Sequence, residues 1–174
     1  EFLWAMGDEM MMPYIQGQFE KKKPMGAFHR KAMDYFRQYM IVGGMPQAVK
    51  KYVETRDFEK VDEAKRDILA LYRNDIKKYA DNQETKVSAI FEEIPSQLQK
   101  HEKKFRLSTL QDNARMRDYS QAFFWLSDAR VVNCCYNSTE PCIGLKLNED
   151  RTTVKCYLND TGLLISHAFD ERGI

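Results

Sequence analysis

The sequence predicts a mainly α-helical fold with a small β component, in which a helical linker bundle is followed by a winged-helix-like domain with a C-terminal β hairpin. Two observations support this prediction. Apolar residues recur at helical spacing through the first hundred positions, and most of the strand-type segments come after residue 130. With 174 residues, 43% of them hydrophobic, the chain can bury one sizeable core or two small ones.

The first half is predicted to be helical throughout. After an irregular apolar opening, a helix is expected over 27–39, and its apolar side carries Phe28, Met33, Phe36, Tyr39 and Met40. Gly43, Gly44 and Pro46 break this helix, and Pro46 can open a short helix that reaches Tyr52 because its missing amide donor costs nothing in a first turn. The clearest amphipathic helix covers 57–79.

The second half changes from helices to strands. The expected order is a helix from Thr85 that passes Pro95, a short strand over 105–107, a helical turn over 108–110 and a helix over 115–126. Three strand-type segments separated by polar turns follow, at 131–136, 143–147 and 154–158. This order of helices followed by a hairpin is typical of a winged helix.

Composition excludes several broad classes of protein. Lys and Arg total 27 against 26 acids, so the net charge of +1 supplies no general attraction to nucleic acid or membranes. The sequence contains neither an apolar run of about 20 residues nor a secretion signal, so a cytoplasmic location without membrane contact is expected. The four cysteines, at 134, 135, 142 and 156, lack zinc-site spacing and are expected to be reduced thiols.

No catalytic, cofactor-binding or metal-binding residue is predicted. The Gly43-Gly44-Met45-Pro46 turn is too short for a phosphate loop and lacks its lysine. The three histidines stand apart from one another and from the cysteines, and the Glu102-Lys103-Lys104 run resembles a nuclease element only by chance in a chain so rich in Lys and Glu.

A nucleic-acid surface is one hypothesis for the winged-helix region. The segment 97–130 contains seven basic residues and four acidic residues. A helix starting near Arg115 would enter the major groove of DNA. The candidate contacts are Lys103, Lys104, Arg106, Asn113, Arg115 and Arg117. An excess of three charges is small for phosphate binding, so a winged helix that packs only against protein is the competing interpretation.

Five ordered motifs together resemble a known family. They are YMIVGGMP at 39–46, YRNDIKKY at 72–79, IPSQL at 94–98, WLSDA at 125–129 and KCYLNDTGLL at 155–164. The sequence resembles the prokaryotic AAA-type ATPases that carry a C-terminal domain of unknown function, number 4143. The resemblance implies an ATPase-lid remnant at 1–24, a helical linker at 25–82, a winged-helix-like domain at 83–158 and the start of a truncated nuclease-like domain at 159–174.

The resemblance also implies a function. The chain would be the middle piece of a longer ATPase, and its partners would be the upstream ATPase module and the downstream domain of that protein. ATP and Mg would bind only the parent protein, because this chain has no Walker A or Walker B motif. The leading hypothesis is therefore a non-catalytic regulatory or interaction module with a protein or DNA partner. The alternatives are an independent winged-helix DNA binder and an enzyme with an unfamiliar site.

Overall fold

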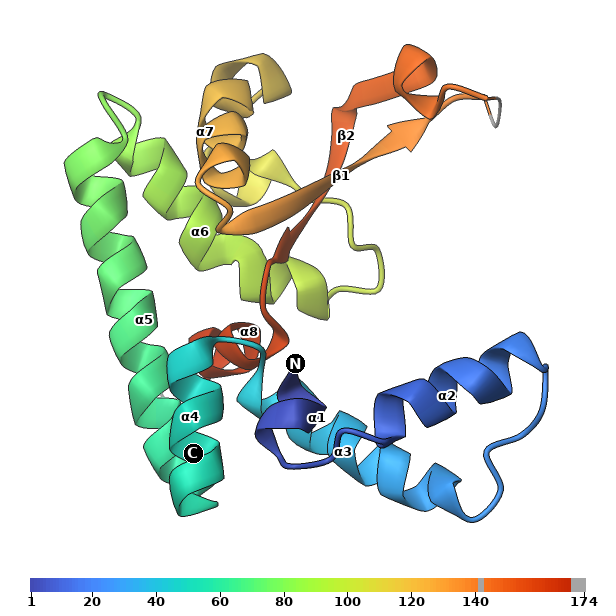
Figure 1. The fold of residues 1–174 in the computed structure, drawn as a ribbon. Coiled ribbons are helices and arrows are strands. Elements are labelled where there is room, and N and C mark those ends of the chain that lie inside the picture. Colours follow the sequence, from blue (N-terminus) through green and yellow to red (C-terminus); the bar gives the residue numbers. More distant parts are fainter. Residues whose placement is uncertain (141–142, 170–174) are drawn as a thin grey trace. The chain divides into compact units, whose positions relative to one another are not determined.

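The computed structural model describes residues 1–140 and 143–169 and confirms a mainly helical chain with one antiparallel β hairpin (Figure 1). The chain forms two compact units. The helical unit comprises Glu1–Ile68 and the described residues from Asp160 onward, and the hairpin unit comprises Leu69–Asn159. The boundary falls inside helix α5, Phe58–Tyr79. Among the described residues, no helix combines the length and the apolar character needed to cross a membrane.

The helical unit contains the first half of α5 and five further helices. These are α1 (Phe2–Ala5), α2 (Met11–Glu20), α3 (Phe28–Val42), α4 (Pro46–Thr55) and α8 (Thr161–Ala168). Pro46 is the first residue of α4, as predicted. The apolar core of this unit contains Phe2, Val42, Tyr52 and Val61, so α1, α3, α4 and α5 share one buried centre.

Helix α8 contacts the end of α3 through the Asp160 side chain and through a close backbone approach at Gly162, and we call this contact the α3–α8 junction. Asp160 caps α8 by accepting a hydrogen bond from the Leu163 amide (2.8 Å), and its second oxygen accepts one from the Gly44 amide (2.6 Å). A Cβ on Gly162 would lie 2.7 Å from the Gly43 nitrogen, so only glycine permits this close approach. Residues 160–169 therefore belong to the helical unit, whereas the sequence analysis placed 159–174 in a separate domain.

A buried polar network also holds α5 within this unit. The Lys65 side chain is 1% exposed, and its ammonium donates to the carbonyl of Ile41 at the end of α3 (2.9 Å). Asp62 accepts hydrogen bonds from the hydroxyl of Ser166 and from Arg66 Nε (2.6 Å). Burial lowers the pKa of Lys65, although the nearby Asp62 carboxylate opposes the shift. Each charged group has a partner, so the network ties α3, α5 and α8 together.

The hairpin unit has two helices packed against the hairpin and two short 3-10 helices. These are α6 (Glu84–Gln99), η1 (Leu107–Thr109), α7 (Met116–Asp128), β1 (Val132–Ser138), η2 (Leu145–Asn148) and β2 (Glu149–Leu158). Strands β1 and β2 pair antiparallel, with Val132 opposite Leu158 and Cys134 opposite Cys156, and their register shifts between Tyr136 and Asn137. Phe91 of α6, Phe123 of α7 and Val154 of β2 are buried, and the rings of Phe105 and Phe123 lie 5.3 Å apart. In Figure 1 the hairpin extends away from α6 and α7.

Two strand predictions in this unit need correction. The strand expected at 143–147 is wrong, because Gly144 adopts a left-handed conformation (φ +92°) and Leu145–Asn148 form a 3-10 helix. The alternating Ile143, Leu145 and Leu147 therefore stay exposed instead of lining a sheet. The strand expected at 105–107 is reduced to one backbone hydrogen bond, from the Phe105 amide to the Val154 carbonyl (2.8 Å).

Candidate functional site

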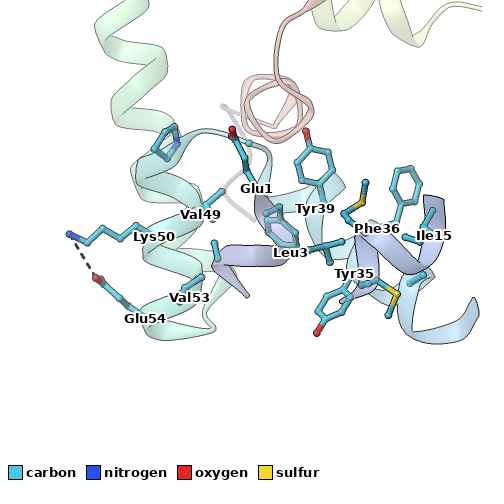
Figure 2. A pocket seen from close by; sticks show the side chains of 17 residues that line it. Glu1, Leu3, Ile15, Tyr35, Phe36, Tyr39, Val49, Lys50, Val53 and Glu54 are labelled. Carbon is cyan, nitrogen blue, oxygen red and sulfur yellow. Dashed lines mark ion pairs between the residues drawn. The ribbon is translucent and has the colours of Figure 1, made fainter. Parts of the chain in front are cut away.

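An apolar groove of about 920 Å³ lies in the helical unit, between α1, α2, α3 and α4 (Figure 2). It is lined mainly by aliphatic, aromatic and methionine side chains. The lining includes Glu1, Leu3, Met11, Met12, Ile15, Ala32, Tyr35, Phe36, Tyr39, Gly44, Val49, Lys50, Val53 and Glu54. Figure 2 shows Val49 and Val53 on α4 and Tyr35, Phe36 and Tyr39 on α3. A hollow with apolar walls from four helices has the form that is typical of ligand-binding sites.

Several groove side chains are unusually exposed for their size. Phe36 is 53% exposed, and Met12 and Tyr39 are each 37% exposed. Contiguous apolar surface that faces water marks a site for another molecule, because burying it would release about 25 cal/mol per Å² of apolar area. Phe36 and Tyr39 belong to the apolar side predicted for the helix over 27–39, and much of this side is exposed in the structure.

Three of the residues that line the groove are charged. Lys50 and Glu54 form an exposed i,i+4 ion pair on α4, with 3.9 Å between the ammonium and the carboxylate. Glu1 is the remaining charged lining residue. In the described part of the chain, no cysteine, histidine or serine lines the groove, and most of the lining residues are apolar.

The predicted nucleic-acid contacts all lie in the hairpin unit, but half of them are engaged locally. The ammonium of Lys103 donates to the carbonyl of Leu98. Arg106 pairs with Glu102 at 3.3 Å, and Arg117 lies 3.6 Å from Asp118. These partners reduce the positive charge that remains for phosphate groups.

Two of the other three predicted contacts lie just before α7, and the third follows α6. Asn113 adopts a left-handed conformation (φ +60°), and Arg115 is the N-cap of α7 with an extended backbone. Lys104 is exposed in the segment after α6. Hydrogen bonds from Thr152 lower the pKa of Asp150, and the charge of Lys104 adds to this effect. The structure places these residues on connecting segments, so nucleic-acid contact by them stays a prediction.

The described cysteines are free thiols. Cys134 and Cys156 face each other across the hairpin, and the fourth cysteine, Cys142, lies outside the described residues. A hydrogen bond with Cys134 and burial raise the pKa of Cys156, whereas the same hydrogen bond lowers the pKa of Cys134. Within the described ranges, 1–140 and 143–169, no three His, Cys, Asp or Glu side chains cluster as metal ligands.

The sequence did not predict the groove, because helical periodicity identifies an apolar face but does not show whether other residues pack against that face. One available signal was the concentration of methionines and aromatic residues in the first forty positions, among them Met10, Met11 and Met12. A methionine-rich apolar surface is typical of binding sites that adapt to their ligand. An excess of such residues in a small helical segment could therefore have indicated an interaction surface.

Comparison with known proteins corrects the resemblance inferred from the five motifs. A family model described as Domain of unknown function (DUF8612) matches residues 33–171. No curated protein and no solved structure matches the chain. The assignment to AAA-type ATPases with domain 4143 is therefore wrong, and the expected lid remnant, ATPase parent, ATP and Mg lose their basis.

The structure explains two of the motifs by packing. Gly43 and Gly44, from the first motif, meet Asp160 and Gly162, from the last, in the α3–α8 junction. Such a junction needs glycines where two backbones approach closely and a carboxylate where a helix begins, whatever the protein does. The family match covers most of the sequence and overrides these local similarities. The chain belongs to the family described as Domain of unknown function (DUF8612).

Proposed function

We propose that this chain is a protein-interaction module whose α1–α4 groove binds an apolar segment of a partner protein. The observation that supports this most directly is the groove itself, with apolar walls from four helices and an exposed Phe36. Its volume of about 920 Å³ suits an elongated apolar ligand. An amphipathic helix is the recurring ligand of grooves between helices, since its side chains at i, i+3, i+4 and i+7 project from one face.

The shape and composition of the walls support a helical ligand. Tyr35, Phe36 and Tyr39 are spaced by one and three residues on α3, and Val49 and Val53 are spaced by four on α4, so each helix offers a ridge of side chains. A third helix can place its own ridge between two such ridges. The methionines of α2 have flexible side chains that adapt to the ligand's surface.

The test is peptide binding measured by isothermal titration calorimetry. The probes are synthetic amphipathic helices of roughly 18 residues, or about five turns, with one leucine stripe. Phe36→Asp should weaken binding at least about tenfold, because a buried aromatic anchor contributes about 2 kcal/mol or more at an interface. Phe124→Asp, on an aromatic residue of α7 that is 64% exposed, is the matched control and should leave affinity unchanged.

Two outcomes would contradict this function. In the first, no amphipathic peptide binds the full chain. In the second, Phe36→Asp binds as tightly as the unmodified protein while circular dichroism shows both to be folded. Phe36 is already half exposed, so an aspartate there should be tolerated by the fold.

We propose nucleic-acid binding by α7 as a second candidate function. The exposed face of this helix presents Arg117, Ser120, Gln121 and Phe124, which can donate hydrogen bonds or stack on bases. The test is the salt dependence of binding to a mixed-sequence duplex, which should be steep if several phosphates are contacted. A flat response, or no binding at low salt, would exclude this candidate.

Both candidate functions are proposed for a cytoplasmic protein. The supporting observation is the pair of free thiols at Cys134 and Cys156, which lie opposite each other on the two strands. A reducing compartment keeps such neighbouring thiols from oxidation. Fractionation of cells that produce the protein, followed by detection with an antibody, would test this location.

A further inference from the structure

One end of the groove carries a cluster of positive charge. The segment 20–37, which covers the turn between α2 and α3 and most of α3, contains six Lys or Arg residues and two acids. Three of the lysines, Lys21, Lys22 and Lys23, are consecutive and exposed. In a chain with a net charge of +1, this is a local concentration of charge.

Ion pairs neutralise only part of this cluster. Lys31 pairs with Asp8 at 2.7 Å, and Arg37 pairs with Asp34 at 2.9 Å. Within the part of the chain that the structure describes, Lys21, Lys22, Lys23 and Arg30 have no ion-pair partner, and we call these four residues the basic turn. Their charges are therefore available to a ligand.

The basic turn is held beside the groove. The hydroxyl of Tyr14 donates to the carbonyl of Met25 (2.9 Å), and the rings of Tyr14 and Phe28 lie 4.9 Å apart, so the turn is fastened to α2. Ile15, the last α2 residue that lines the groove, precedes Lys21 by six positions, which is about 9 Å along a helix.

The opposite end of the groove differs in charge. On α4 the basic lining residue, Lys50, already pairs with Glu54, and Glu1 adds a carboxylate to the same lining. The groove is thus apolar along its length and positive at the end formed by α2 and α3. A ligand that matches both features must be apolar on one face and acidic at one end.

We infer that the occupant of the groove is an acidic amphipathic helix of a partner protein, with its acidic end against the basic turn. This inference rests on the proposed interaction function and adds the chemistry of the partner. The apolar stripe of the helix would supply most of the affinity, because burying apolar side chains stabilises a complex more than exposed ion pairs do. Its carboxylates would supply orientation, the association rate and discrimination against basic helices.

The experiment compares two synthetic helical peptides that share one leucine stripe and differ only in polar residues, glutamate in one and lysine in the other. Calorimetry with the full chain at about 50 mM salt should show the glutamate peptide binding at least about tenfold more tightly, since several weak exposed ion pairs act together. The difference should shrink at about 500 mM salt, where exposed charges are screened within a few ångströms.

Charge reversal locates the effect. The triple variant Lys21→Glu, Lys22→Glu and Lys23→Glu should remove or invert the preference for the glutamate peptide. The control has the same change in net charge at exposed lysines of the hairpin unit, with the substitutions Lys77→Glu, Lys78→Glu and Lys104→Glu. This control should keep the preference.

The outcomes separate this inference from the proposed function. Equal binding of both peptides, or an equal effect of the two triple variants, would overturn the inference that the partner helix is acidic. The proposal that the groove binds an apolar segment would still stand. Binding of neither peptide would overturn both proposals. Tighter association with vesicles of anionic phospholipid than with the glutamate peptide would replace the helix by a membrane surface.

Discussion

Replacing Asp160 by alanine should destabilise the helical unit by about 3 kcal/mol. The carboxylate is 7% exposed and accepts two hydrogen bonds, from the amides of Leu163 (2.8 Å) and Gly44 (2.6 Å). Loss of an N-cap costs about 1 kcal/mol, and loss of a hydrogen bond to a charged group costs about 1.5–3 kcal/mol. For a chain of this size, a loss of about 3 kcal/mol lowers the melting temperature by roughly 6–12 °C.

The matched control for this prediction is Asp160→Asn. Asparagine caps helices about as well as aspartate, so it should keep the cap and lose only the charge-assisted part of the Gly44 contact. The assay is urea unfolding followed by Trp4 fluorescence in a Trp125→Phe background, because Trp4 lies in the helical unit and Trp125 in the hairpin unit. An Asp160→Ala change within about 0.5 kcal/mol of the parent would refute the reasoning, since surface substitutions cost no more than that.

Three further predictions follow from contacts elsewhere. Burial raises the pKa of Asp62, but hydrogen bonds from Ser166 and Arg66 outweigh burial and hold this pKa below 3.8. The ionised Asp62 therefore stabilises the fold, and this stabilisation is lost as pH falls through the folded-state pKa. Ser166→Ala should therefore move acid unfolding, followed by circular dichroism, to higher pH. Arg117→Ala should reduce the salt slope of any duplex binding by about 1. Timed iodoacetamide labelling with mass spectrometry should modify Cys134 before Cys156, whose pKa is raised.

Local patterns predicted the helices well. The segment 57–79, read from apolar residues at three- and four-residue intervals, corresponds to α5 at Phe58–Tyr79. Pro46 marks the start of α4 because its ring and missing amide suit only a first turn. Each signal lies within the element that it predicts, so one sequence is enough to identify it.

Features that depend on distant residues could not be predicted in this way. Gly44 and Asp160 are 116 positions apart, and nothing local to either indicates that they share a hydrogen bond. The apolar residues of α3 have the correct period, but their exposure depends on what α1, α2 and α4 leave uncovered. At 143–147, alternation alone suggested a strand, and the left-handed conformation of Gly144 produced a 3-10 turn instead.

The α3–α8 junction and the groove share one residue, which gives the junction a consequence for binding. Gly44 lines the groove, and its amide donates to Asp160, which does not line it. Asp160 thereby fixes the turn that joins α3 to α4, and both of these helices line the groove. A contact made for stability therefore also positions the binding surface.

This arrangement predicts that Asp160→Ala weakens peptide binding even in the folded protein. At a temperature where circular dichroism shows the variant fully folded, its affinity for the glutamate peptide should fall several-fold, because walls that move between arrangements reduce the binding-competent fraction. Asp160→Asn should retain most of the affinity. Equal affinities for Asp160→Ala and the parent under those conditions would show that α4 keeps its position without the Gly44 contact, and the junction would then serve stability alone.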